Sequence, residues 1–308
     1  MENNIQRLEL HISYDCVNNC IFCSEHKQLI KFKGYFLPKS VVNNVLEKYH
    51  KGRINHVTFT GGEPTFHPDF VEIVKLAKTK GYKTYTTSNG GLFYLKDFTR
   101  EALNYVDEFC FSLHGHSAKL HNFHTNNEHS FDNLLRALKN IDRHPKDIFG
   151  IVNIVLTRYN FGSLDRIIKF ISNFKKIKQI LISNIAPEGN ALDNFCELSV
   201  PLKLIKENIR TIISEADRNS LVVRFFGIPL CILNNYQGCS NDLWWSPRTT
   251  IEKMHRSSQR FLKVTHSYRP VRGRIYTVVC QRCAKKNICG GIFKRYYKEF
   301  GDKELSPI

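Results

Sequence analysis

The chain has 308 residues, of which 42% are hydrophobic and 24% are charged, as is ordinary for a soluble globular protein. No apolar run approaches the roughly 18 residues of a membrane-spanning helix, and the polar beginning MENNIQRLEL is not a secretory signal. A chain of this length buries roughly 75% of its unfolded surface and needs no disulfides to hold a core. We therefore expect a cytoplasmic protein without a membrane segment.

The net charge is strongly basic, because 45 Lys and Arg residues stand against 28 Asp and Glu residues, giving +17. Such a charge favours an anionic partner, such as RNA, an acidic peptide or a phosphorylated metabolite. The basic residues are spread along the chain as isolated pairs, for example Lys175-Lys176 and Lys285-Lys286, which suits a solvated surface equally well. A nucleic-acid partner is therefore considered but not favoured.

Short β-rich runs alternate with segments whose apolar residues recur at helical spacing. The expected strands cover residues 8–13, 56–60, 83–88, 108–114, 151–157 and 179–183. Strands that alternate with helices predict a parallel sheet with right-handed crossovers. Six such units favour an α/β fold, a partial TIM-type (βα)6 barrel whose chemistry belongs at the C-terminal strand ends. A doubly wound open sheet is the structural alternative.

The alternation of strands and helices stops after Asn190. A helix over about 201–217 and a strand over 221–226 are expected next, and the stretch from Cys231 to Cys280 is expected to be irregular. We place a domain boundary within about residues 190–220. The two expected domains, a partial barrel and a small cysteine-rich extension, are 1–200 and 201–308.

Ten cysteines in a reducing compartment indicate metal or redox chemistry rather than disulfides. Cys16, Cys20 and Cys23 follow the first expected strand with the spacing C-x3-C-x2-C. A structural zinc site normally has four ligands, and no second cysteine pair follows Cys23 within a suitable distance. Iron-sulfur clusters accept thiolates at such short spacing, and three thiolates on a four-iron cluster leave one iron open for a substrate.

The segment CVNNCIFC, with the aromatic Phe22 before its third cysteine, resembles the cluster loop of the radical S-adenosylmethionine (radical SAM) superfamily. GGEP at 61–64, directly after the expected strand HVTFT, is similar to that family's second motif. The resemblance covers roughly residues 8–190. It implies a 4Fe-4S cluster on the three cysteines, S-adenosylmethionine on the open iron, and a reductant such as flavodoxin or ferredoxin. The resulting 5'-deoxyadenosyl radical would abstract hydrogen from a substrate.

The resemblance also implies roles for single residues around S-adenosylmethionine. Gly61 and Gly62 would let the backbone approach closely, Glu63 would accept from the cofactor's ammonium group, and Pro64 would begin the next helix. Phe22 is expected near the adenine. Ser88 and Asn89, at the end of the third strand, would contact the ribose or the methionine part.

Alternation within strands adds candidates. Cys110, Ser112 and His114 share one face of their strand, so Ser112 and His114 are expected at the site, whereas Cys110 suits plain packing. Asn153 is a lone polar residue in an apolar strand and is a further candidate ligand. The histidine-rich stretch HGHSAKLHNFHTNNEHS has no metal-ligand spacing and is expected to form a lid.

A second cysteine group lies near the C-terminus, with Cys280, Cys283 and Cys289 followed by two glycines. Cys231 is favoured as its fourth ligand and Cys239 is the alternate. Zinc is the default for four such cysteines. In this context the pattern resembles the SPASM or twitch extensions of radical SAM enzymes, which implies a second, auxiliary 4Fe-4S cluster.

The leading hypothesis is a radical SAM enzyme that oxidises, cross-links or epimerises a peptide or a small natural-product metabolite. Cys196, in a loop, is the free cysteine best suited to return a hydrogen atom in an epimerisation. Because the chain begins at the first strand, a peptide substrate would need a separate recognition protein. The alternatives are a radical SAM enzyme that modifies RNA or a nucleotide-derived cofactor, and a non-catalytic zinc-binding nucleic-acid module.

Overall fold

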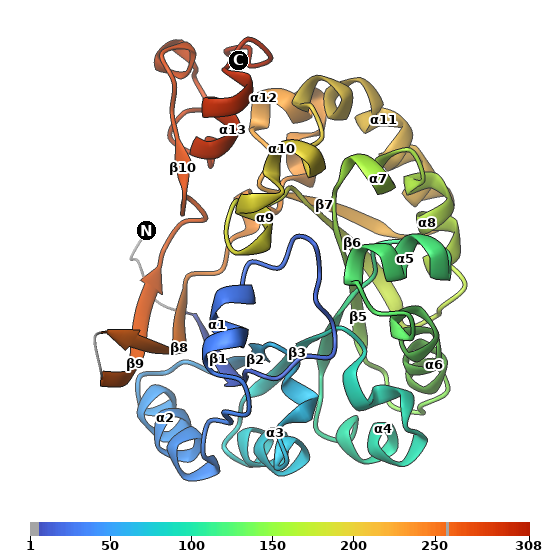
Figure 1. The fold of residues 1–308 in the computed structure, drawn as a ribbon, viewed down its shortest axis with the longest axis vertical. Helices are drawn as coiled ribbons and strands as arrows, with labels where there is room; N and C mark the ends of the chain where they lie inside the picture. Colours follow the sequence, from blue (N-terminus) through green and yellow to red (C-terminus); the bar gives the residue numbers. More distant parts are fainter. Residues whose placement is uncertain (1–5, 257–258) are drawn as a thin grey trace.

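The computed structural model describes residues 6–256 and 259–308, which form an α/β fold around one nine-stranded sheet (Figure 1). The strand order is β7-β6-β5-β4-β3-β2-β1-β8-β9, and all neighbours are parallel except β8 and β9. The strands are β1 (Arg7–Ser13), β2 (His56–Gly61), β3 (Lys83–Ser88), β4 (Glu108–Ser112), β5 (Phe149–Val155), β6 (Ile177–Ser183), β7 (Val222–Phe226), β8 (Arg248–Arg256) and β9 (Gln259–Ser267). A separate two-stranded sheet pairs β10 (Arg274–Ile275) with β11 (Ile292–Phe293).

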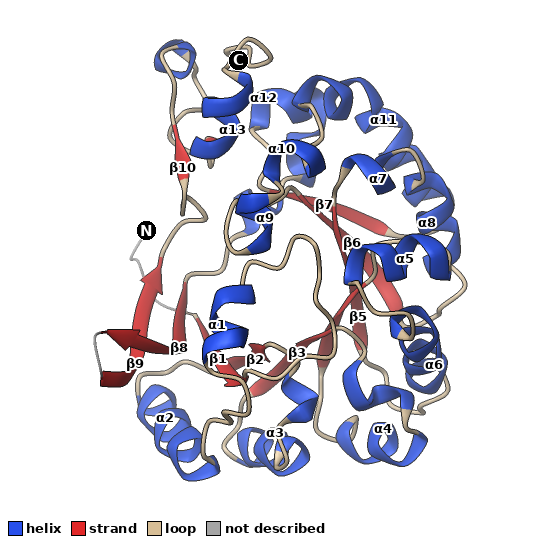
Figure 2. Ribbon diagram, viewed as in Figure 1, coloured by secondary structure: helices blue, strands red, loops and turns tan. Residues whose placement is uncertain are grey.

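The longer helices lie along the outer side of the curved sheet, and the strands form the inner layer (Figure 2). The helices are α1 (His26–Lys31), α2 (Lys39–Lys51), α3 (Phe70–Thr79), α4 (Lys96–Ala102), α5 (Ala118–Thr125), α6 (Ser130–Asp142), α7 (Arg158–Phe161), α8 (Leu164–Ile171), α9 (Asn190–Asp193), α10 (Phe195–Leu198), α11 (Leu202–Arg218), α12 (Leu230–Leu233) and α13 (Lys294–Phe300). Each of the six expected strands is present.

The core lies between the sheet and these helices. On β1, Leu8, Leu10 and Ile12 are completely buried, and each such side chain contributes about 1.5–3 kcal/mol. Their neighbours Glu9 and His11 point to the opposite, inner face, because side chains alternate along a strand. This strand therefore has an apolar outer face and a polar inner face, and the inner face is where a site can form.

Two expectations about the second half of the chain need correction. The strand near 221–226 belongs to the main sheet, because β7 pairs parallel with β6. The stretch between Cys231 and Cys280 is not irregular, since β8 and β9 form a long antiparallel hairpin and β8 pairs parallel with β1. The sheet therefore continues across residue 200, although the division into two domains stays a prediction.

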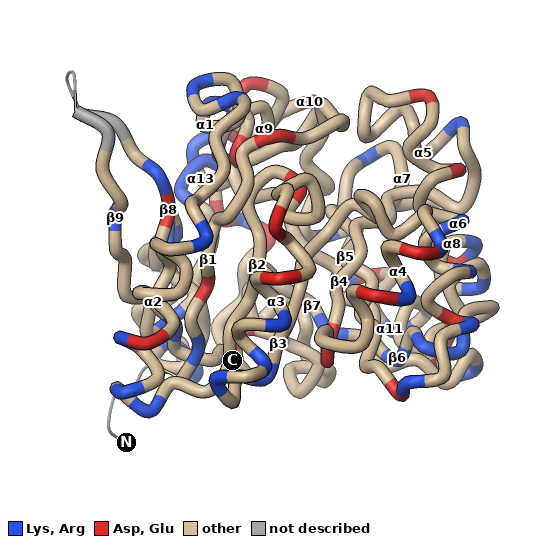
Figure 3. The backbone as a smooth tube through the Cα atoms, turned by 90° about the horizontal axis from the view of Figure 1, so that it is seen from below, with Lys and Arg blue, Asp and Glu red and all other residues tan. Residues whose placement is uncertain are grey.

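Charged residues are distributed over many elements in the described part of the chain. Figure 3 shows Lys and Arg mixed with Asp and Glu along the helices, not gathered on one face. Within residues 6–256 and 259–308, no helix is long and apolar enough to cross a membrane.

Candidate functional site

The three clustered cysteines lie together in the loop between β1 and α1. Cys16, Cys20 and Cys23 all line one cavity of about 410 Å³ at the C-terminal ends of the first strands. The same cavity is lined by Gly61 and Gly62 from the end of β2. The loop and the glycine turn, 45 residues apart in the sequence between Cys16 and Gly61, therefore form one site.

Burial governs the chemistry of these thiols. It raises the pKa of Cys16 to about 12 and that of Cys23 to about 11, and it raises the pKa of Cys20 well above its usual value. Backbone N–H groups of Asn18 and Glu25 point at the sulfurs of Cys16 and Cys23 and partly oppose this effect. Thiolates in such a place need a compensating cation. Three sulfur donors that receive N–H hydrogen bonds suit an iron-sulfur cluster.

The glycine turn is held tightly against the cysteine loop. Gly62 donates its N–H to the Ser13 carbonyl at 2.9 Å, and Glu63 donates its N–H to the Asp15 carbonyl at 2.8 Å. Gly61 has a φ of +129°, and a Cβ there would lie 2.2 Å from the Ser13 carbonyl oxygen. Only glycine allows this approach of β1 and β2.

The structure corrects the role expected of Glu63. Its side chain is fully buried beneath the turn and does not line the cavity. One carboxylate oxygen accepts from the Thr65 N–H, the Thr65 hydroxyl and the Ser88 hydroxyl, and the other accepts from the Asn89 N–H. Glu63 thus ties β2 to the end of β3, and Pro64 begins the short 3-10 turn that follows. These four hydrogen bonds and its complete burial assign Glu63 to holding the turn.

Five of the expected cofactor residues, besides the two glycines, reach the cavity from neighbouring strands or from the loop. Ser88 and Asn89 follow β3, and Asn89 donates its Nδ2 to the Cys16 sulfur at 3.3 Å. Ser112 ends β4. Phe22 packs edge-to-face on His114, with ring centroids 4.7 Å apart.

The histidine-rich stretch does not form a lid over the cavity. Helix α5 lies against the cysteine loop, where Asn19 and Ile21 donate their N–H groups to the carbonyls of Thr125 and His124. His121 and His124 are completely buried, and burial lowers the pKa of His121 to about 3. A lid needs a mobile, exposed segment. The buried, neutral histidines of α5 instead make hydrogen bonds and support the cysteine loop from one side.

Two other candidate residues, Asn153 and Cys196, do not line this cavity, and Cys110 was expected only to pack. Asn153 accepts a hydrogen bond from the Ser183 hydroxyl at 2.7 Å across β5 and β6. Cys110 is buried within β4. Cys196 is exposed on α10, with its sulfur 3.2 Å from a Glu299 oxygen.

The C-terminal cysteines form a second group beside α12. Cys231, Cys280, Cys283 and Cys289 line one small cavity, whereas Cys239 does not. The Cys289 sulfur lies 3.5 Å from the Leu230 N–H and 3.4 Å from the Gly291 N–H. Four thiols that converge in this way, with backbone N–H groups directed at Cys289, could hold a metal ion or an iron-sulfur cluster.

A second, wider cavity of about 620 Å³ adjoins the first, and sequence reasoning missed it. Glu9, His11 and Glu25 line both cavities, while Trp245 and Arg248 line only the second. Its far wall is the β8-β9 hairpin, in a stretch that was expected to be irregular. The alternating polar residues of LELHIS were the signal that β1 has a polar inner face.

Comparison with known proteins agrees with this arrangement. Residues 10–171 match the model of the Radical SAM superfamily, which is more than half of the chain. The chain belongs to the radical SAM superfamily. Membership in this family implies a 4Fe-4S cluster and S-adenosylmethionine as cofactors, which fits the three thiols and the adjoining cavity.

Among curated relatives, a probable GTP 3',8-cyclase of Saccharolobus solfataricus is 29% identical over 191 residues, 60% of this chain and 58% of that protein. A probable GTP 3',8-cyclase of Thermoplasma volcanium is 23% identical over 217 residues, 70% of this chain and 65% of that protein. The chain thus matches less than two thirds of the length of these relatives.

Among solved structures, Streptococcus suis SuiB bound to S-adenosylmethionine superposes with a TM-score of 0.68 at 14% identity, covering 99% of this chain and 77% of that one. SuiB bound to its precursor peptide SuiA gives 0.59 at 18% identity, covering 73% and 50%. At this identity the likeness concerns the fold alone.

Proposed function

We propose that this protein is a radical SAM enzyme with two iron-sulfur clusters. The observation that carries the proposal is the convergence of Cys16, Cys20 and Cys23 with the glycine turn on one cavity at the strand ends. Three thiols, and not four, leave one iron of a 4Fe-4S cluster for a cofactor. The non-catalytic zinc module has no comparable support, because it would leave the adjoining cavity without a purpose.

When bound, the cluster and S-adenosylmethionine supply reductive cleavage to a 5'-deoxyadenosyl radical that abstracts hydrogen from a substrate. The chain's own residues position and shield these groups. Asn89 fixes the Cys16 sulfur through its Nδ2, and Glu63 fixes the Asn89 backbone from beneath. Phe22 and His114 close the cavity with an aromatic wall, and burial holds the pKa of His114 well below its usual value, so His114 is neutral. A neutral wall suits a radical that must not meet water.

The second cluster would sit on Cys231, Cys280, Cys283 and Cys289, in an extension of the SPASM or twitch kind. Convergence of these four sulfurs on one cavity supports Cys231 as the fourth ligand in preference to Cys239. An auxiliary cluster there could take an electron from a substrate radical, in keeping with an oxidation or a cross-linking reaction. Cys196 remains a proposal as a hydrogen donor, and its exposed position on α10 gives that role no added support.

For the substrate, we favour a peptide or a small natural-product metabolite. A reductant such as flavodoxin or ferredoxin would supply the electron to the cluster. The wider cavity offers about 620 Å³ between the inner face of the sheet and the β8-β9 hairpin. That is room for an amino-acid side chain or a small metabolite. SuiB, solved with a precursor peptide, shares the fold, which is compatible with a peptide substrate. A separate peptide-recognition protein stays part of this proposal.

A nucleotide substrate is the second candidate, because the curated relatives are named probable GTP 3',8-cyclases. The arginines of the wider cavity give it limited support. Of the four arginines that line this cavity, Arg248, Arg272 and Arg274 pair with carboxylates. Arg269 makes hydrogen bonds to the Tyr276 hydroxyl and the Cys289 carbonyl, and among the described residues it pairs with no carboxylate, so it is the arginine left to bind a phosphate. Equilibrium binding of GTP to the reconstituted protein distinguishes the two candidates.

Iron content tests the two-cluster proposal. Anaerobic reconstitution is expected to give about eight irons per chain, as two four-iron clusters require. Cys231→Ala should lower this to about four, or to a labile cluster, while the matched control Cys239→Ala should keep about eight. Equal iron content in the two variants would exclude Cys231 as a ligand, and colourless protein containing zinc would exclude the proposal as a whole.

A further inference from the structure

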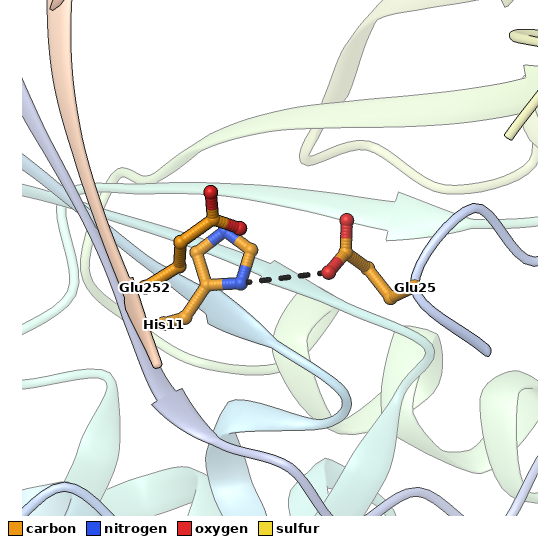
Figure 4. A group of neighbouring side chains, drawn as sticks. All are labelled: His11, Glu25 and Glu252. Atoms are coloured by element: carbon orange, nitrogen blue, oxygen red, sulfur yellow. Dashed lines mark ion pairs between the residues drawn. The ribbon is translucent and has the colours of Figure 1, made fainter. Parts of the chain in front are cut away.

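Three ionisable side chains beside the cofactor cavity have no role in the proposed function. His11 comes from β1, Glu25 from the end of the cysteine loop and Glu252 from β8, and their side chains gather at one place (Figure 4). One ligand atom of each, a ring nitrogen or a carboxylate oxygen, lies within 4.8 Å of the others. Segments far apart in the sequence thus bring one imidazole and two carboxylates together.

The imidazole of His11 gives the strongest indication that this group binds a ligand. His11 is more than nine-tenths buried, and its Nδ1 has no hydrogen-bond partner among the residues that the structure describes. The nearest carboxylate oxygen, from Glu25, is 3.9 Å away, too far for a hydrogen bond. Buried polar atoms are rarely left without a partner, and a bound ligand accounts for this one.

The two carboxylates differ from the others that line the same cavity. Glu9 and Glu188 each pair with an arginine, at 3.1 and 2.9 Å. Among the residues whose side chains the structure describes, Glu252 pairs with the partly exposed Lys263 at 3.5 Å, and Glu25 makes the long ion pair with His11. Two neighbouring carboxylates with so little compensation favour a bound cation.

We propose that His11, Glu25 and Glu252 bind a divalent first-row metal ion such as Mn²⁺, Fe²⁺ or Zn²⁺. One nitrogen and two oxygen donors are the ligand types that these ions accept. An ion about 2.0–2.2 Å from each donor holds the donors about 3–4 Å apart. The observed separations need only small rotations of the two glutamate side chains to close around it.

The position of this metal site suggests what it does. His11 and Glu25 line both the cofactor cavity and the wider cavity, and Glu252 lines the wider one. Three protein ligands leave further positions of the ion open. The ion therefore binds an oxygen donor of the substrate, a carbonyl, carboxylate or hydroxyl group, at the junction of the two cavities. Metal binding itself requires no turnover, so its test is independent of the proposed reaction.

The test uses Mn²⁺ alone, added to tag-free protein purified anaerobically with its iron-sulfur content intact. Electron paramagnetic resonance of free Mn²⁺ gives the stoichiometry, and the bound spectrum reports nitrogen coupling from His11. We expect one Mn²⁺ per chain with nitrogen coupling. Glu252→Gln and His11→Phe should each weaken binding at least about tenfold, since even indirect metal contacts are worth about 10–100-fold.

Glu188→Gln is the matched control, because Glu188 lines the wider cavity outside the group. It should bind Mn²⁺ like the unaltered protein. Equal affinity of Glu252→Gln and Glu188→Gln, an absence of stoichiometric binding, or bound Mn²⁺ without nitrogen coupling would each overturn the proposal. Iron content is measured for every variant. Glu252 lies more than 200 residues from the cysteine loop in sequence. If His11→Phe lowers the iron content, Glu252→Gln is therefore the variant that tests the metal site.

Discussion

Replacing Gly61 by alanine tests how tightly the glycine turn is fitted under the cysteine loop. The new Cβ would lie 2.2 Å from the Ser13 carbonyl oxygen, where ordinary contact begins at 3.4 Å, so β1 and β2 must separate by more than 1 Å. The positive φ of +129° adds strain of about 1–2 kcal/mol to an overpacking cost of about 1–3 kcal/mol. We expect Gly61→Ala to lose about 2–5 kcal/mol of unfolding free energy and most of its iron.

The matched control is Gly162→Ala. Gly162 ends α7 with a φ of −71°, and a Cβ there would meet no described heavy atom within 4 Å beyond its own chain neighbours. Alanine there should be neutral or stabilise the protein by about 0.4–1 kcal/mol. Urea unfolding followed by circular dichroism gives the free energy of unfolding of each variant, and iron analysis gives its iron content. Equal unfolding midpoints for Gly61→Ala and Gly162→Ala would refute the close approach of β1 and β2.

The contacts of single side chains lead to three more predictions. Glu63→Gln replaces an acceptor oxygen by an amide group that faces a donor, and it should cost about 1–3 kcal/mol in urea unfolding; an unchanged midpoint would contradict the buried network. Because the pKa of His121 is about 3 when folded and about 6.5 when unfolded, its contribution to stability is complete above pH 6.5 and is lost as the pH falls, by about 2 kcal/mol at pH 5. His121→Asn should therefore flatten the fall of the urea midpoint between pH 7 and pH 5, and an equal slope would contradict the neutral, buried histidine. Asn89→Ala removes the hydrogen bond to the Cys16 sulfur and should shift the cluster's reduction potential to more negative values in a dye-mediated titration, whereas an unchanged potential would show that this contact is not made.

The first half of the fold was readable from sequence because local signals and tertiary structure agree there. Each expected strand has an apolar face that packs on helices, as Leu8 and Leu10 show on β1. The cysteine spacing and the GGEP turn likewise carry their chemistry in short stretches. Such patterns can be recognised in the sequence without knowing which residues lie next to them in space.

The missed features have two causes: charged residues that mask the alternation of a strand, and contacts between segments that are far apart in the sequence. The hairpin of β8 and β9 carries charged residues such as Lys253 and Lys263, which disguise its alternation. The role of Glu63 was mistaken because its partners Ser88 and Asn89 arrive from another strand. A motif names a residue type, but only packing decides which way the side chain turns.

The most direct test of the central claim is cleavage of S-adenosylmethionine by the reconstituted protein. Anaerobic incubation with dithionite and S-adenosylmethionine should release 5'-deoxyadenosine, measured by liquid chromatography, and Cys20→Ala should abolish it. Release that is absent from the iron-loaded protein, or that persists unchanged in Cys20→Ala, would contradict the assignment of the cysteine loop.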